Sequence, residues 1–154
     1  METVWKSKLS RNLKVRFFQA TVESVIIVRC GKLTLTRTLE KRLDGAYTRM
    51  LRAALDISWT KHITNIELFG NLPKITDTLK ERRLRFIGHV WRKTDEMAQK
   101  LLLCEPMPGK RYSYMYVDQL RDNTGFEKKN LMEKMQNRKE WRSLVQYALA
   151  SSSM

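Results

Sequence analysis

Apolar residues in this sequence recur at spacings of three and four positions, and residues that interrupt helices are scarce. The spacing is clearest between positions 36 and 57, where the apolar side chains are Leu39, Leu43, Ala46, Met50 and Ala54. A helix advances about 100° per residue and so gathers these side chains on one face. The 154 residues include only 6 glycines and 3 prolines, too few for the many turns of a β-protein. The sequence therefore predicts an all-α fold.

We expect an irregular bundle of about six to seven helices. Three helices are predicted over 8–30, 36–57 and 74–93, a short helix over 97–103, and a further one over 116–121. In the first of these, the apolar residues at helical spacing are Leu9, Leu13, Phe17, Val22, Val25 and Ile26. A short β-hairpin around 25–36 is the alternative for the end of this helix, because Val25 to Val28 favour strands and Gly31 favours a turn. We prefer a helix that ends at Gly31.

Three residue pairs have the spacing of an N-terminal capping box, in which a side-chain oxygen and a Glu three positions later satisfy free backbone amides. They are Thr64 with Glu67, Thr124 with Glu127, and Asn137 with Glu140. Each predicts the start of a helix, and Gly70 is expected to end the first one.

Prolines and glycine gather in one segment, 105–115, which holds Pro106, Pro108 and Gly109. This composition predicts a linker. The chain would then consist of a basic helical region over 1–104, the linker, a C-terminal helical segment over 116–150 that packs on the basic region, and a tail over 151–154.

The chain carries 30 Lys and Arg against 16 Asp and Glu, a net charge of +14. This excess favours a polyanionic partner such as RNA, DNA or an RNA–DNA hybrid. By region the charge is +7 over 1–60, +5 over 61–111 and +2 over 112–154, so we expect the anion-binding face in the first two thirds.

The sequence contains Cys, His, acidic residues and glycines, but not at the spacings that catalysis or metal binding requires. Cys30 and Cys104 have no further Cys or His at ligand spacing, acidic residues form no metal-binding cluster, and the glycines are isolated. We therefore expect no catalytic residues, no metal and no cofactor.

No stretch is apolar enough for a membrane span or a secretory signal, so we expect no membrane partner and a nuclear or cytoplasmic location. The sequence indicates no oligomeric state.

The helix predicted over 74–93 carries the most informative pattern. Arg82, Arg85, His89 and Arg92 fall within a sector of roughly 80° on the helix and form what we call the basic face. The opposite side carries apolar residues, which are Ile75, Leu79, Leu84, Phe86, Ile87, Val90 and Trp91, with Arg83 among them. A solvated surface is the alternative to a phosphate-binding one, but such a surface usually alternates the sign of its charges. We expect the basic face to bind nucleic acid, supported by Lys41, Arg49 and Arg52 if the two helices share a face, and by Lys110 and Arg111.

Several stretches resemble the region that follows the polymerase palm in endonuclease-reverse transcriptases of LINE-type, non-long-terminal-repeat retrotransposons. The resemblance lies in the segments 9–30, 33–55, 63–75, 116–122, in ERRLRFIGHVWRK at 81–93 and in NRKEWRSLV at 137–145. The arginine-rich stretch that ends in Gly88, His89 and Val90 is the most specific. The chain departs from the family's pattern at 28–33 and in its shorter linker.

The resemblance implies a fragment or descendant of a reverse transcriptase that binds template and primer backbone. The family's metal-binding Asp pair lies before the matched region, so no polymerase or endonuclease activity is expected from this chain. Two alternatives stay open: a non-functional remnant of a decayed element, and a basic protein-interaction module. In an intact enzyme, Leu9, Phe17, Phe18 and Ile26 would partly pack on the palm, and a remnant would expose them.

Overall fold

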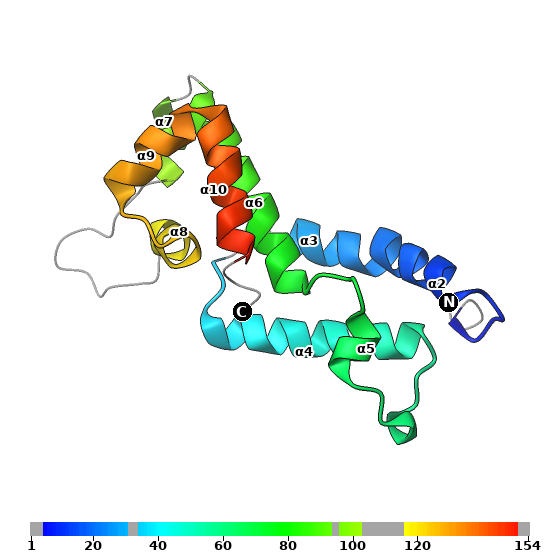
Figure 1. The fold of residues 1–154 in the computed structure, drawn as a ribbon. Coiled ribbons are helices and arrows are strands. Elements are labelled where there is room, and N and C mark those ends of the chain that lie inside the picture. Colours follow the sequence, from blue (N-terminus) through cyan, green and yellow to red (C-terminus); the bar gives the residue numbers. More distant parts are fainter. Residues whose placement is uncertain (1–4, 31–33, 94–95, 103–115, 151–154) are drawn as a thin grey trace. The chain divides into compact units, whose positions relative to one another are not determined.

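The computed structural model describes residues 5–30, 34–93, 96–102 and 116–150, and within these ranges the chain is helical and has no strand (Figure 1). The predicted all-α fold is confirmed. The elements are α2 (Arg11–Phe18), the π-helical turn η1 (Gln19–Glu23), α3 (Ser24–Cys30), α4 (Arg37–Ala54), the 3₁₀ turn η2 (Trp59–Lys61), α5 (Asn65–Phe69), α6 (Ile75–Arg92), α7 (Glu96–Leu102), α8 (Tyr116–Thr124), α9 (Lys128–Gln136) and α10 (Arg138–Ala150).

The alternative of a β-hairpin around 25–36 is wrong for the residues that are described. Positions 25–30 belong to α3, and positions 34–36 form no strand. Helical structure is already established at Arg11 and continues through η1, and extending a helix costs far less than starting a new structure. The β-branched residues of α3 therefore follow the helix that precedes them.

The chain divides into two compact units that differ from the predicted regions. The first unit comprises Met1–Gly31 and Arg37–Thr78, and the second comprises Lys32–Thr36 and Leu79–Met154. The boundary falls inside α6, whereas the predicted linker over 105–115 and the tail over 151–154 lie outside the described residues. The reason is that α6 shares one core with α8, α9 and α10, so segments on both sides of the predicted linker fold together.

In the first unit, aromatic side chains join α2, α4 and α5. The ring of Tyr47 on α4 lies 5.3 Å from that of Phe18 and 6.2 Å from that of Phe69. The Tyr47 hydroxyl also donates a 3.0 Å hydrogen bond to Oε2 of buried Glu23. Arg11 donates from Nη2 to the carbonyl of Leu68 at 2.8 Å, which ties α2 to α5.

The face of α2–α3 that packs on this core is not the predicted one. The structure buries Lys14, Phe18, Glu23 and Ile27. The exposed large apolar side chains, which we call the apolar stripe, are Leu9, Leu13, Phe17, Val25 and Val28. Burial of Lys14 is possible because its Nζ donates a 2.6 Å hydrogen bond to the carbonyl oxygen of Trp5. Hydrogen bonding thus allows polar positions to face the core while apolar ones face outward.

The second unit has a core of apolar side chains from four helices. Its buried members are Leu84, Ile87, Leu120, Leu131, Met135, Trp141, Leu144, Val145 and Ala148. Nε1 of Trp141 donates a 2.9 Å hydrogen bond to the carbonyl oxygen of Leu84, so this indole joins α10 to α6. Figure 1 shows α10 running alongside α6.

The capping predictions have different outcomes. Thr64 and Glu67 form a complete capping box at the start of α5, which ends at Gly70. Asn137 accepts from the Lys139 amide at 3.0 Å and donates to Glu140 at 2.7 Å at the start of α10. The Thr124 prediction is wrong: Thr124 is the last residue of α8, and its hydroxyl donates to the Leu120 carbonyl within that helix.

Candidate nucleic-acid interface

Helix α6 holds the predicted basic face in a single unbroken helix of 18 residues. The amide and the hydroxyl of Thr76, in the first turn of α6, donate hydrogen bonds to the carboxylate of Asp44 on α4. Asp44 thereby satisfies one of the free backbone amides at the start of α6. Asp77 in the first turn and Arg92 in the last turn complement the helix dipole. The helix therefore gains from charges within its own end turns and from a tertiary hydrogen bond to α4.

The structure exposes all four side chains of the basic face, but two of them also make internal contacts. Arg85 forms an ion pair with Glu81 at 2.5 Å, one turn earlier on α6. Arg92 donates from Nη1 to the carbonyl oxygen of Met135 at 2.9 Å, in the last turn of α9. Arg92 therefore has a structural function in addition to any contact with a ligand.

Two residues that α6 was expected to place on its apolar side behave differently. Phe86 is 58% exposed, so its predicted burial is wrong. Arg83 is buried at 4% exposure. Burial raises the pKa of Tyr116, and the positive charge of Arg83 opposes that rise in pKa. Arg83 thus lies on the covered side of α6 as its position predicts, whereas Phe86 lies on the exposed side, because contacts with other segments decide how far the covered side extends around the helix.

Three members of the basic face, Arg85, His89 and Arg92, line one side of a groove of about 740 Å³, and α10 lines the other, whereas Arg82 is not among the lining residues. We call this the cationic groove. Its lining residues are Glu81, Arg85, His89, Arg92, Arg138, Trp141, Arg142, Val145 and Gln146. Among these, four are arginines and one is an acid, Glu81, which already pairs with Arg85. The groove thus presents a surplus of positive charge around an apolar floor of Trp141 and Val145.

Sequence reasoning missed Arg138 and Arg142. The net charge over 112–154 is only +2, so the sequence predicted the anion-binding face in the first two thirds of the chain. A local signal was nevertheless present, because the two arginines lie four positions apart and flank Trp141, which is on the core-facing side of the same helix. Because Trp141 is buried in the core, it fixes which side of α10 carries Arg138 and Arg142.

Gly88 sets how closely the two walls of the groove approach. A Cβ atom at this position would overlap Nε1 and Cδ1 of the Trp141 indole. Only glycine leaves room for the indole against the α6 backbone. The most specific motif of the sequence, around Gly88 and His89, therefore combines a packing requirement with one groove-lining residue.

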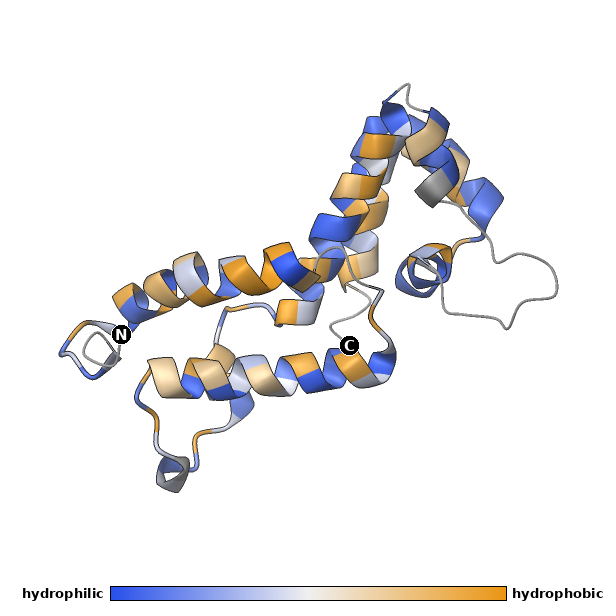
Figure 2. Cartoon of the chain, turned by 180° about the vertical axis from the view of Figure 1, so that it is seen from behind, coloured by the Kyte–Doolittle hydropathy of each residue, from blue (hydrophilic) through white to orange (hydrophobic). Residues whose placement is uncertain are grey.

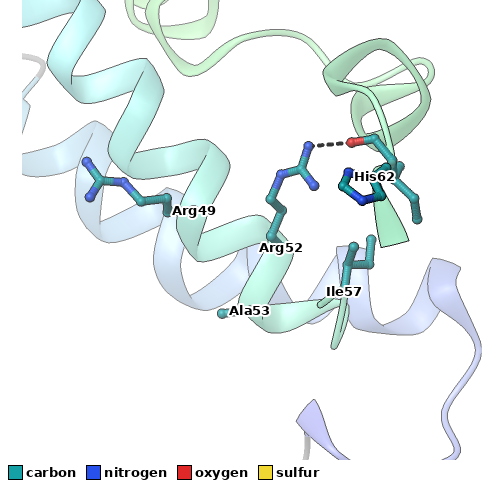
Figure 3. A pocket seen from close by; sticks show the side chains of 6 residues that line it. Arg49, Arg52, Ala53, Ile57 and His62 are labelled. Carbon is teal, nitrogen blue, oxygen red and sulfur yellow. Dashed lines mark hydrogen bonds between the residues drawn. The ribbon is translucent and has the colours of Figure 1, made fainter. Parts of the chain in front are cut away.

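The predicted supporting residues Lys41, Arg49 and Arg52 belong to the first unit. Lys41 and Arg49 are exposed, whereas Arg52 donates to the carbonyl of Ile63 at 2.7 Å and to Oδ1 of Asn65 at 3.0 Å. Figure 3 shows Arg52 directed at the loop around His62 while Arg49 extends away from it. Arg52 therefore holds this loop in place. The remaining two predicted residues, Lys110 and Arg111, lie outside the described residues.

The described part of the chain offers neither a cluster of metal ligands nor a membrane-spanning helix. These residues contain no cluster of three or more His, Cys, Asp and Glu that could hold a metal ion. Their helices include none with the length and hydropathy needed to cross a membrane. Comparison with protein-family models, with curated proteins and with solved structures finds no match for this chain.

Proposed function

We propose that this protein binds the phosphate backbone of nucleic acid through the cationic groove. The observation that carries the proposal is the composition of the groove: four arginines and a histidine, with Glu81 as the one acid among the described lining residues. Guanidinium groups suit this task because their planar donors match phosphate oxygens in pairs.

The arrangement favours recognition of the backbone over recognition of base sequence. The arginines come from two helices that face each other across the groove, so a strand lying between them meets cations on both sides. Neutralising phosphates releases condensed counterions, which makes such binding steeply dependent on salt. The module would act in the nucleus or the cytoplasm and would have no catalytic activity of its own.

We further propose descent from the region after the palm of a LINE-type reverse transcriptase. The support is that two of the segments that carry the resemblance, the one with Gly88 and the one with Trp141, lie side by side in the structure. These segments, 81–93 and 137–145, supply most of the residues that line the cationic groove, and they meet where Trp141 binds the Leu84 carbonyl. The hydrogen bond between Trp141 and Leu84 thus joins these two segments at the proposed binding surface.

The salt dependence of binding tests the proposal. We expect the R138Q/R142Q variant to bind a short DNA duplex more weakly than the parent. Its slope of log affinity against log salt should be shallower by about 1.8, because each phosphate contact contributes roughly 0.9. The matched control is K6Q/R16Q, which removes two exposed cations from the first unit. Equal effects of both variants on affinity and slope would mean that the groove has no special part in binding.

A change at Glu81 tests the same surface with the opposite sign. The E81Q variant removes the acid that pairs with Arg85 at the edge of the groove. We expect duplex affinity to rise about threefold, a modest gain because both side chains are partly solvated and surface pairs are weak. Unchanged or weaker binding by E81Q would show that Arg85 does not contact phosphate.

A protein-interaction module is the second candidate function, and the apolar stripe is the observation that favours it. Leu9, Leu13 and Phe17 are 45%, 51% and 39% exposed along one side of α2 and the turn before it, and Figure 2 shows hydrophobic turns along α2 and α3. Exposed apolar surface of this kind is common at protein contacts. Tight partner binding that is insensitive to salt, combined with no duplex binding, would favour this function.

A further inference from the structure

Phe86 lies exposed among basic residues of α6 and of the position that follows this helix. At 58% exposure, its ring is largely in contact with solvent although it belongs to a helix with a well-filled apolar face. Leu84 and Ile87, its neighbours on the same helix, are almost completely buried in the second unit's core. The exposure of Phe86 therefore results from its position on the helix and not from a poorly packed unit.

The spacing of the neighbouring exposed residues places this ring among positive charges. Arg82, Phe86, His89 and Lys93 follow one another at intervals of four, three and four positions, and all four are exposed. At about 100° per residue, Arg82, Phe86 and His89 of α6 fall within a sector of roughly 60° on the helix, and Lys93 directly follows the last residue of α6. We call this set of four residues the exposed row. From Arg82 to His89 it spans about 10 Å at a rise of 1.5 Å per residue.

His89 connects the exposed row to the cationic groove, because it belongs to the row and also lines the groove. A strand whose phosphates lie in the groove would therefore pass beside the row. Phosphate contacts explain the cations of the row but not the ring, since an apolar ring between cations gains nothing from a phosphate. An unpaired base has an apolar face that stacks on such a ring.

We propose that Phe86 stacks on an unpaired base, so that the protein prefers single-stranded nucleic acid, or a junction with an unpaired end, over continuous duplex. This inference rests on the proposed function, because the groove must first hold the backbone. It specifies which nucleic acid is bound. In duplex the base faces are covered by their neighbours and the ring has nothing to stack on.

Three labelled probes separate the contributions of phosphate and base: an oligo(dT) of about 12 nucleotides, an abasic deoxyribose-phosphate strand of the same length, and a duplex of the same length. Fluorescence anisotropy gives the affinity of the full chain for each. We expect oligo(dT) to bind about tenfold more tightly than the abasic strand, since base–aromatic stacking is the interaction that the abasic strand lacks.

Substitutions at Phe86 assign this difference to the ring. F86A should weaken oligo(dT) binding about tenfold and leave the abasic strand and the duplex unchanged. F86W should retain oligo(dT) binding, whereas F86L, which keeps apolar area but has no ring, should lose it. The control is I66A, which removes a side chain that is 85% exposed on α5 of the first unit and should change nothing.

The outcomes distinguish the two proposals. If the parent binds the abasic strand and the duplex but F86A leaves oligo(dT) affinity unchanged, the inference about Phe86 is overturned and the proposed backbone binding stands. An equal loss of F86A on oligo(dT) and the abasic strand would also overturn the inference. If the parent binds none of the probes at low salt, both proposals fail.

Discussion

The helix pairs of the two units differ in how closely they approach and in what they present outward. In the first unit, α2–α3 packs on α4 through rings that meet edge to face and a buried Tyr47–Glu23 hydrogen bond, and its outer side is the apolar stripe. In the second unit, α6 packs on α10 through Gly88 and Trp141, and its outer side is cationic.

This difference separates two means of fixing helix packing. A glycine against an indole leaves no freedom in the distance between helices, so the arginines on either side of the groove are held at a set separation. Rings that meet edge to face tolerate a wider range of distances. We therefore expect the second unit to respond more strongly than the first to small changes of volume, and the predictions below test this from the largest expected effect to the smallest.

The largest effect is expected from the same substitution made in each unit. G88A places a Cβ on the Trp141 indole and should lower the free energy of unfolding by about 3 kcal/mol, the upper end for overpacking. G45A meets no atom within 4 Å in the middle of α4 and should raise it by about 0.7 kcal/mol, the gain of alanine over glycine in a helix. Denaturant unfolding measures both. If G88A and G45A change the free energy of unfolding similarly, the two units do not differ in their sensitivity to added volume.

Loss of the buried Tyr47–Glu23 hydrogen bond should lower the free energy of unfolding by less than G88A does. Y47F removes the donor to Glu23, a residue that is itself buried, and should cost about 2 kcal/mol because the carboxylate loses a partner that water cannot replace. The matched control is Y147F, which alters a tyrosine that is 69% exposed on α10 and should have a small effect. A loss in Y47F no larger than in Y147F would show that this bond does not stabilise the unit.

The same tyrosine predicts a dependence on pH. Burial, followed by the nearby Glu23 charge and its hydrogen bond, raises the pKa of Tyr47 well above its ordinary value of 10.0. The unfolded chain therefore releases this proton as the pH passes about 10, while the folded chain retains it, so stability is complete below that pH and falls above it. Melting temperatures from pH 9 upward should decline less steeply in Y47F than in the parent. Parallel declines would argue against a raised pKa for this group.

Capping comes next in size. T64A should lower stability by about 1 kcal/mol, the usual loss for a capping hydroxyl. A double-mutant cycle with E67A should show coupling of about 0.5 kcal/mol, because the two residues bond each other's backbone amides. The corresponding cycle with T124A and E127A in the second unit should show none, because Thr124 bonds inside α8. Coupling in the second cycle would contradict the assignment of these helix ends.

The smallest effect is expected on the apolar stripe. L13Q replaces a side chain that is 51% exposed on α2 and should change stability by less than about 0.5 kcal/mol. L84Q, in the core of the second unit, should instead cause a loss of several kcal/mol. Size-exclusion chromatography of L13Q checks in addition whether the stripe promotes self-association. A large destabilisation by L13Q would show that the stripe is covered in solution.

Local signals in the sequence predicted much of the fold. The all-α class, the long helix that contains the basic face, and the Thr64–Glu67 box depend on neighbours within four positions, and the structure confirms them. The failures have a different origin. Thr124 has the same spacing to a glutamate as Thr64, but its side chain is buried at the end of α8, where tertiary packing decides its partner.

The candidate site divides in the same way. The sequence indicated that Arg82, Arg85, His89 and Arg92 share one side of a helix, and the structure exposes all four. It did not indicate Arg138 and Arg142, because their relation to α6 depends on Trp141 reaching the Leu84 carbonyl, 57 positions away. Nor did it show that Arg52 is engaged with the carbonyl of Ile63.

The amino-acid sequence by itself determined that this chain is helical, basic and equipped with a cationic helix face, since helix periodicity and charge are properties of neighbouring residues. Tertiary structure alone decided that the apolar stripe faces outward, that Phe86 is exposed among cations, and that α10 completes the cationic groove. Periodicity fixes the angle of each side chain around its own helix, but contacts between distant segments fix which side of that helix is covered.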